Sequence, residues 1–503
     1  MSSGRLSSRE LTRAYLQRID RLNPLLGAVI ETNPNAIAIA AQRDAERRAG
    51  IVRGPMHGIP VLLKDNIATD DSMQTTAGSV VLLNSRVPAD SPMVARLREA
   101  GAVILGKANL SEWANFRGFG SISGWSARGG FSRNPYLLNY FPAGSSSGSA
   151  ISAAANLCSC AVGTETSGSI TTPASYNHTV GIKPTVGLIS QSGIIPISNT
   201  QDTAGPMTRT VTDAAILLGA MQSPWGSVDP DSVPNDYTAF LDPDALQGAR
   251  IGIDRKYFSP GFGDPAIADA VETAITVMGS LGATFEDTDS GDIDALFSAD
   301  DFLIVLLYEF RVQMANYLGR LKHTAARNLA DLIRLNQIRC PQEMKYFGQE
   351  LFELAITFPP ALDKAVYQAS RQFTWSVTRT NGIDKALQEQ NLDAIIAPGT
   401  GPAVIMPAVA GYPSLALPLS ILPDGRPAGM YFYSGFLQEP KLISLAYALE
   451  QALPPRATPM FLNSIPPEPP DAGICAGFPK NTPGQGSGIG MRRGQILKQM
   501  SQL

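Results

Sequence analysis

The sequence predicts an α/β protein built around one large sheet, on three observations. Apolar residues recur at helical spacing between Leu11 and Leu22. Residues 59–63 form a short apolar run behind a Gly-Ile-Pro turn, which is typical of a buried strand. A helix start at Asp90-Ser91-Pro92 precedes a helix to residue 100 and a second apolar run over residues 102–105. This alternation favours a sheet covered by helices.

The remaining elements follow from the same patterns. Ser7 or Ser8 is a suitable cap for the first helix. Further helices are expected over residues 36–48, 148–157, 212–221, 266–281, 300–321 and 441–453, with a short one opening at Ser169. Further strands are expected over residues 161–163 and 394–397 and within residues 413–432.

The chain is predicted to hold one main domain, residues 1–463. Within it, residues 223–390 have the weakest strand pattern and are interpreted as a mainly helical insertion that shapes the substrate site. Residues 464–503 are rich in proline and glycine and cannot bury much apolar surface, so a flexible tail is expected there.

Composition excludes several functional classes. The 503 residues carry a formal net charge of −4, without the clustered Lys and Arg that nucleic-acid binding requires. The polar N-terminus lacks the apolar core of a signal peptide, and no apolar stretch is long enough to span a bilayer. A cytoplasmic protein without nucleic-acid or membrane partners is expected, as a monomer or homodimer. The alternative is that translation begins at an earlier codon and that a signal sequence precedes Met1.

Cysteine and histidine are scarce. Four cysteines in a chain of this length do not form a disulfide scaffold, and Cys158 and Cys160 are interpreted as small packing residues. The three histidines are scattered along the sequence and complete no ligand set with the cysteines. No metal site is predicted.

Two serine-bearing, glycine-rich segments carry the chemistry, at residues 144–149 and 163–170. A serine hydroxyl is a weak nucleophile until a base takes its proton. Because histidine is scarce, the suspected base is Lys64, which ends an apolar run. Burial would lower the pKa of such a lysine and populate the neutral amine, which can accept a proton. These parts predict an amide or ester hydrolase.

The residues alone do not settle the role of each serine. Ser169 follows a Ser-Gly turn at a predicted helix start, where backbone N–H groups can converge on an oxyanion. It is therefore the better candidate for the nucleophile, and Ser145 or Ser146 for a proton relay.

The chain resembles the amidase signature family over residues 11–459. The resemblance is densest between Gly144 and Met207, which includes Gly181-Ile182-Lys183-Pro184-Thr185 and Gln201-Asp202-Thr203-Ala204-Gly205-Pro206. It implies a large, twisted, mixed central sheet with helices on both faces. It also implies a Ser–Ser–Lys triad and a covalent acyl-enzyme, with neither metal nor cofactor.

The family roles map residue by residue. Lys64 matches the base, Ser145 the relay serine after a cis peptide bond, and Ser169 the nucleophile. Thr164 and Ser146 are expected to support the triad. The implied oxyanion hole is formed by the backbone N–H groups of Thr166, Ser167, Gly168 and Ser169. Four residues depart from the usual family residues, which puts the substrate in doubt but removes no triad atom: Ala143, Ser147, Ser167 and Thr171.

Segments at residues 109–118, 121–130, 330–333 and 346–350 resemble the peptide-amidase branch, which removes C-terminal amides from peptides. Trp113 and Trp125 in these segments have two interpretations, packing in the core or a loop and contact with substrate, and packing is at least as well supported. The alternatives are a small-amide hydrolase, an esterase with the same triad, an amidotransferase subunit acting on misacylated tRNA, and a catalytically idle scaffold that binds amides or a partner.

Overall fold

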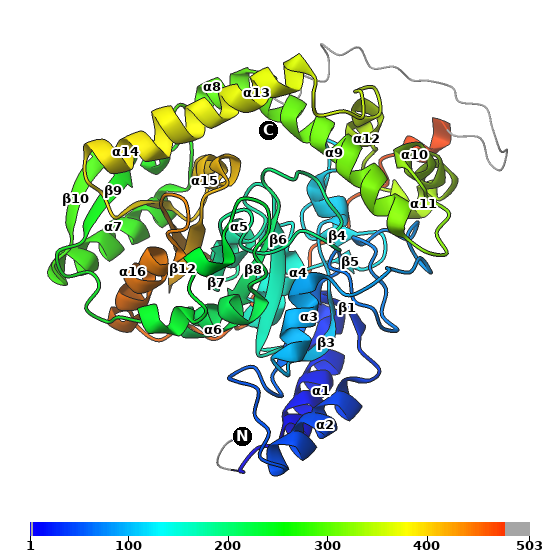
Figure 1. Cartoon of the computed structure of the whole chain (residues 1–503), viewed down its shortest axis with the longest axis horizontal. Coiled ribbons are helices and arrows are strands. Elements are labelled where there is room, and N and C mark those ends of the chain that lie inside the picture. The colour runs from blue at the N-terminus through cyan, green and yellow to red at the C-terminus, as the bar shows by residue number, and fades with distance from the viewer. Residues whose placement is uncertain (2–3, 478–503) are drawn as a thin grey trace.

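A computed structural model describes Met1 and residues 4–477 (Figure 1). Its centre is an eleven-stranded sheet in the order β1-β3-β2-β6-β8-β7-β12-β13-β11-β9-β10. The strands of this sheet are β1 (Val29–Thr32), β2 (Pro60–Lys64), β3 (Val103–Ala108), β6 (Cys160–Glu165), β7 (Val180–Lys183), β8 (Thr203–Thr208), β9 (Arg250–Asp254), β10 (Thr284–Thr288), β11 (Ala394–Pro398), β12 (Ser414–Ile421) and β13 (Pro427–Tyr433). A separate ribbon pairs β4 (Trp125–Ser126) with β5 (Gly130–Phe131).

Sixteen α-helices are found in the described part of the chain. They are α1 (Ser8–Leu26), α2 (Ala36–Arg48), α3 (Pro92–Glu99), α4 (Ser147–Ala154), α5 (Thr171–Tyr176), α6 (Val211–Met221), α7 (Pro265–Ser280), α8 (Ile293–Ser298), α9 (Asp301–Arg320), α10 (Leu329–Ile338), α11 (Cys340–Glu343), α12 (Glu350–Ala355), α13 (Ala365–Trp375), α14 (Asp384–Glu389), α15 (Ile405–Ala410) and α16 (Glu439–Ala452). Shorter 3₁₀ segments cover Glu112–Asn115, Pro230–Ser232, Tyr237–Phe240, Arg255–Phe258, Pro402–Val404 and Ile474–Gly477, and a π-helical segment covers Ser376–Ile383.

The sheet is mixed, as the resemblance implied. β2 runs parallel to both β3 and β6, and β9 runs parallel to both β10 and β11. Antiparallel pairs join these two groups through β8, β7, β12 and β13. The predicted α/β class with one large central sheet is confirmed.

Local sequence explains the element boundaries. Ser7 caps α1 by accepting a hydrogen bond from the Glu10 N–H (3.1 Å), while the Glu10 carboxylate accepts one from the Ser7 N–H (2.8 Å). This reciprocal capping box satisfies two backbone donors at the helix start. Pro92 occupies the first turn of α3, where a missing N–H costs no helical hydrogen bond.

Each face of the sheet has its own apolar core. One face packs against α3, α6, α7 and α16, and the other against α1, α2, α4, α5 and α15. Along β2, Val61 and Leu63 belong to the first core and Leu62 to the second. Because side chains alternate along a strand, Lys64 follows Leu62 onto the face covered by α4 and α5.

Residues 223–390 are largely helical but also contribute β9 and β10 to the sheet edge, which the sequence analysis did not predict. In Figure 1, α13 and α14 form the upper rim of the molecule, and α10–α12 lie to the right. A third apolar core joins α9, α10 and α12 to Trp113 and Phe116.

The segment after α16 returns to the insertion. A disulfide links Cys340 to Cys475, and Glu468 accepts hydrogen bonds from Tyr346 Oη (2.7 Å) and Lys345 Nζ (3.3 Å). The sequence analysis did not predict this bridge. Cys158 and Cys160 are buried and unpaired, which confirms their interpretation as packing residues. Of the expected tail, residues 478–503 lie outside the described part of the chain.

Candidate active site

Lys64 ends the fully buried strand β2, with no solvent exposure of its own. Its Nζ lies 2.7 Å from Ser145 Oγ, 2.9 Å from Thr164 Oγ1 and 3.1 Å from the Thr164 carbonyl oxygen. The Thr164 carbonyl oxygen can only accept a hydrogen bond, so Nζ must be its donor. A neutral amine has two hydrogens and one lone pair, so these three contacts suit two donations to Thr164 and one acceptance from the Ser145 hydroxyl.

Burial lowers the pKa of Lys64 to about 7, against the weaker opposing effect of the Asp202 and Glu165 carboxylates. Desolvation disfavours the ammonium form because its charge loses contact with water. A substantial fraction of Lys64 is therefore neutral at neutral pH, which is the form that accepts a proton.

Ser145 lies directly before α4 and is fully buried. The peptide bond between Gly144 and Ser145 is cis, as the resemblance implied. The Ser145 carbonyl accepts a hydrogen bond from the Ser111 N–H at 3.0 Å, which ties this turn to the loop after β3.

Ser146 binds the neighbouring strand rather than Lys64. Its Oγ donates to the Thr164 carbonyl (3.0 Å) and accepts from the Thr164 N–H (3.1 Å). The Ser146 N–H donates to the Ser169 carbonyl at 3.1 Å. Ser146 thus joins the two serine turns, whereas Ser145 is the serine that contacts Lys64.

Ser169 lies half-buried in the turn before α5. The helix begins at Thr171, two residues later than predicted, because residues 169 and 170 stay in the turn. Gly168 has φ of +89°, and a Cβ there would lie 2.7 Å from Val404 Cγ2 and 2.8 Å from Thr172 Oγ1. Both the conformation and the space therefore require glycine.

The backbone donors of this turn are available to a ligand. None of the hydrogen bonds found among the described residues uses the N–H groups of Thr166, Ser167, Gly168 or Ser169. The next two N–H groups, of Ile170 and Thr171, donate instead to the Glu165 carboxylate, at 2.7 and 2.9 Å. The turn can therefore present donors to an oxyanion without breaking the helix cap.

The structure brings Lys64 and Ser145 into contact but shows no hydrogen bond between Ser145 Oγ and Ser169 Oγ within the described ranges. Ser169 is held beside them through the backbone of Ser146. Catalytic hydrogen bonds are often long before substrate binds and tighten in the complex, so this spacing is compatible with a relay.

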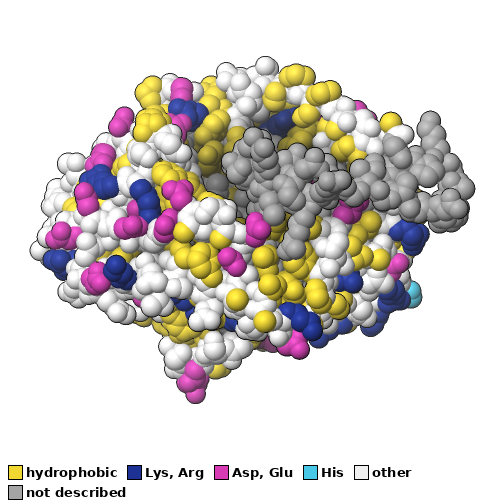
Figure 2. Space-filling view, turned by 90° about the horizontal axis from the view of Figure 1, so that it is seen from above, with side chains coloured by type: hydrophobic (Ala, Val, Ile, Leu, Met, Phe, Trp, Pro, Cys, Tyr) yellow, Lys and Arg dark blue, Asp and Glu magenta, His cyan; other side chains and the backbone are white. Residues whose placement is uncertain are grey.

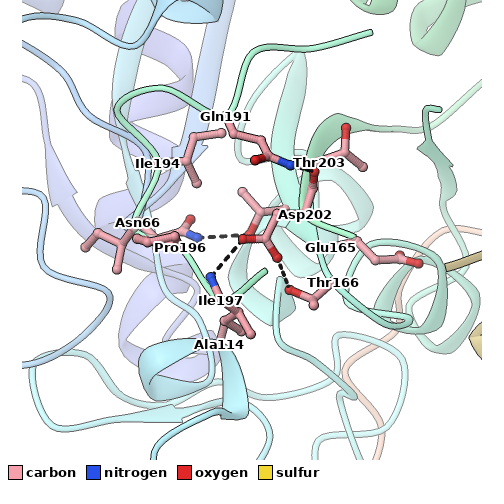
Figure 3. A pocket seen from close by; sticks show the side chains of 12 residues that line it. Asn66, Ala114, Glu165, Thr166, Gln191, Ile194, Pro196, Ile197, Asp202 and Thr203 are labelled. Carbon is pink, nitrogen blue, oxygen red and sulfur yellow. Dashed lines mark hydrogen bonds between the residues drawn. The ribbon is translucent and has the colours of Figure 1, made fainter. Parts of the chain in front are cut away.

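A pocket lies beside these residues, and the side chain of Asp202 is one of those that line it (Figure 3). It holds about 340 Å³ of empty space, including some that is open to solvent. One wall is apolar and comes from Ile194, Ile195, Pro196 and Ile197. The other lining residues are Asn66, Ala114, Thr164, Glu165, Thr166, Gln191, Asp202 and Thr203.

Two carboxylates of the site, Glu165 and Asp202, were not among the residues predicted from the sequence. Asp202 accepts hydrogen bonds from Thr166 Oγ1 (2.6 Å) and the Ile197 N–H (2.8 Å). Burial raises the pKa of Asp202 to about 7 against the effect of these donors. Both acids stand inside otherwise small, uncharged motifs, and that isolation is the signal that could have identified them.

Both flagged tryptophans pack against other aromatic rings. Trp113 is buried and meets Phe352 edge-on, and Trp125 meets Tyr346 and Phe347 edge-on.

Across Met1 and residues 4–477, no group of three or more His, Cys, Asp or Glu side chains is arranged to hold a metal ion. No helix in the same ranges has the length and apolar character needed to cross a membrane.

The chain is similar to known amidases in both sequence and structure. The amidase family model matches residues 10–407. The structure of native peptide amidase from Stenotrophomonas maltophilia is 46% identical with a TM-score of 0.85, covering 92% of this chain and 96% of that one. The peptide amidase PAM in complex with the competitive inhibitor chymostatin gives the same identity and TM-score, covering 92% and 97%. A probable amidase of Arabidopsis thaliana is 43% identical over 91% of this chain and 89% of its own length. The chain therefore belongs to the amidase signature family of enzymes that hydrolyse carbon–nitrogen bonds.

Proposed function

We propose that this enzyme is a serine amidohydrolase that removes C-terminal amide groups from peptides through Lys64, Ser145 and Ser169. The observation that carries the mechanism is the 2.7 Å contact between Lys64 Nζ and Ser145 Oγ, made by a buried lysine with a pKa of about 7. The peptide-amide substrate is supported by the 46% identity to peptide amidase over nearly the whole chain.

In the proposed acylation step, neutral Lys64 takes the proton of the Ser145 hydroxyl while Ser145 takes that of Ser169. The Ser169 Oγ attacks the amide carbon, and the carbonyl electron pair moves onto oxygen. The resulting oxyanion is stabilised by the free N–H groups of residues 166–169. The proton returns through Ser145 to the nitrogen, the C–N bond breaks, and ammonia leaves.

Deacylation repeats the sequence with water. Water gives its proton to the relay and attacks the acyl ester on Ser169, the carboxylic acid leaves, and Ser169 Oγ regains a proton. Lys64 ends as the neutral amine, so the side chains return to their starting protonation states and the proposed cycle uses no cofactor.

The test is ammonia release from N-acetylated amino-acid and dipeptide amides, compared with small aliphatic amides. Ser169→Ala should abolish release, while Ser280→Ala, at an exposed serine on α7, should leave it unchanged. Full activity in Ser169→Ala would overturn the assignment of Ser169 as the nucleophile. Release only from small amides would discard the peptide substrate, and turnover only of the matching methyl esters would make the enzyme an esterase.

A further inference from the structure

The apolar wall of the pocket, Ile194–Ile197, is held through the residue that follows it. Ser198 is fully buried, and its N–H donates to Asp202 Oδ2 at 3.0 Å. The Ser198 hydroxyl donates to Glu309 on α9, in the helical insertion. One residue therefore links the carboxylate beside the oxyanion turn to a carboxylate on a helix more than a hundred positions later.

Glu309 is fully buried, and none of the ion pairs formed within the described residues includes it. Its other donors are the Thr200 N–H (3.1 Å), Thr200 Oγ1 (3.0 Å) and Tyr367 Oη (2.6 Å). A buried carboxylate without a cation depends on such donors to offset the loss of water. Most of the donors come from Ser198 and Thr200, so displacing residues 198–200 would leave Glu309 with only the Tyr367 hydroxyl of these donors.

Apolar contacts also hold the wall Ile194–Ile197 against α9. Ile195 and Ile197 pack in the core that also contains Leu306, Leu307 and Phe310 of α9. The wall is thus fixed on one side by Asp202, which also accepts a hydrogen bond from Thr166, and on the other by the insertion helix. A fixed wall can discriminate between acyl chains by their shape, whereas a loose one repacks around each.

On the proposed function, the leaving group is ammonia, with a single heavy atom. The apolar side of the pocket is therefore free to serve the acyl side of the substrate. We infer that Glu309 is a positioning residue that fixes the wall Ile194–Ile197 through Ser198 and Thr200 and thereby sets which C-terminal residues of a peptide amide the enzyme accepts. This inference rests on the proposed function and adds a determinant of its substrate selection outside the pocket.

The chain offers a matched pair of variants for the test. Ser198→Ala and Tyr367→Phe each remove one hydroxyl donor to Glu309, but only Ser198 adjoins the wall. The readout is kcat/KM for N-acetylphenylalaninamide divided by kcat/KM for N-acetylglycinamide, with Tm measured in parallel. Ser198→Ala should lower this ratio at least about fivefold, since a loose wall gains less from the larger side chain. Tyr367→Phe should leave the ratio unchanged while lowering Tm to a similar extent.

Equal effects of the two variants on the ratio, or no effect of either, would overturn the inference. Thr200→Val provides the second wall-side variant should Ser198→Ala not fold, and it should lower the ratio in the same direction. Glu309→Gln should shift the ratio as Ser198→Ala does, because its amide replaces one acceptor with a donor. Failure of the wild-type enzyme on every peptide amide would instead refute the proposed function, so the two failures are distinguishable.

Discussion

Lys64 Nζ and Ser145 Oγ lie 2.7 Å apart in a fully buried site, and no ion pair within the described ranges neutralises the lysine. The charges of the Asp202 and Glu165 carboxylates raise the pKa of Lys64, although neither forms a salt bridge with it. Desolvation therefore outweighs them and the pKa falls to about 7. This is the arrangement expected of a base, because a salt-bridged lysine would stay protonated.

The first prediction is the pH dependence of kcat/KM. Below pH 7 the Lys64 ammonium has no lone pair, so activity should fall about tenfold per pH unit on the acid side, as expected for one essential base. Above pH 7 the amine is neutral, and activity should rise to a plateau. Ammonia release from one peptide amide at constant ionic strength measures the profile. A profile that is flat from about pH 5 to pH 9 would contradict the role of Lys64.

Glu165 gives a second prediction through the same lysine. In Glu165→Gln the loss of an anion removes an influence that raises the pKa of Lys64, so the acid limb should move to lower pH. The maximal rate should also fall about tenfold or more, because the carboxylate accepts the N–H groups of Ile170 and Thr171 beside the nucleophile. The pH profile of the variant measures both effects.

The control for this experiment is Glu439→Gln. Glu439 is equally buried but accepts a hydrogen bond from the Thr185 N–H and lies near Lys183, not Lys64. The acid limb of the pH profile of Glu439→Gln should match that of the wild type. A limb that shifts equally in both variants would show a general effect of lost charge and exclude the specific coupling.

The two serines should differ in how much activity their removal leaves. Ser145→Ala removes the relay but keeps the nucleophile and the free N–H groups of the turn, so a weak activity should remain, about 10²- to 10⁴-fold below wild type. Ser169→Ala should leave no acyl-enzyme at all. Mass spectrometry of protein quenched during turnover checks this difference. An acyl adduct on Ser169→Ala would contradict the assignment of the nucleophile.

A further prediction concerns the free energy of unfolding and Arg117, which has no role in the proposed reaction. Its guanidinium is fully buried, pairs with Glu112 and Glu343, and lies 4.0 Å from the Phe347 ring centroid. Arg117→Met would strand two buried carboxylates and should lower the free energy of unfolding by about 3–5 kcal/mol. Arg96→Met breaks the exposed pair with Glu99 and should cost less than about 1 kcal/mol. Urea unfolding of both variants compares them, and equal losses would refute the argument.

The sequence predicted the elements whose patterns are local. The helix over residues 36–48 is found with those bounds, and the apolar run ending at Lys64 is a buried strand. The strands β7 and β8 were missed because β7 contains a glycine and β8 a glycine and a proline, and pairing on both sides, not propensity, makes them strands. β9 and β10 were missed inside a stretch dominated by helical patterns.

The site shows the same division. Lys64 and Ser169 could be named because their apolar and glycine-rich surroundings are visible in the sequence, whereas the choice of Ser145 over Ser146 came from the family resemblance. Glu309 could not be named, since its role depends on the contact between α9 and Ser198, which lies 111 positions earlier in the chain. A single sequence carries no local signal for such a long-range contact.

The Cys340–Cys475 disulfide gives the last prediction. Denatured, non-reduced protein should titrate two thiols, Cys158 and Cys160, and four after reduction. The bridge closes a sequence separation of 135 residues, so Cys340→Ser with Cys475→Ser should lose about 4–5 kcal/mol in the chain-entropy account. Cys160→Ala should lower the thiol count by one and keep the sensitivity to reductant. Four thiols without reductant would contradict the bridge. Because disulfides are rare in the cytosol and persist in oxidising compartments, finding two would weigh against the cytoplasmic expectation.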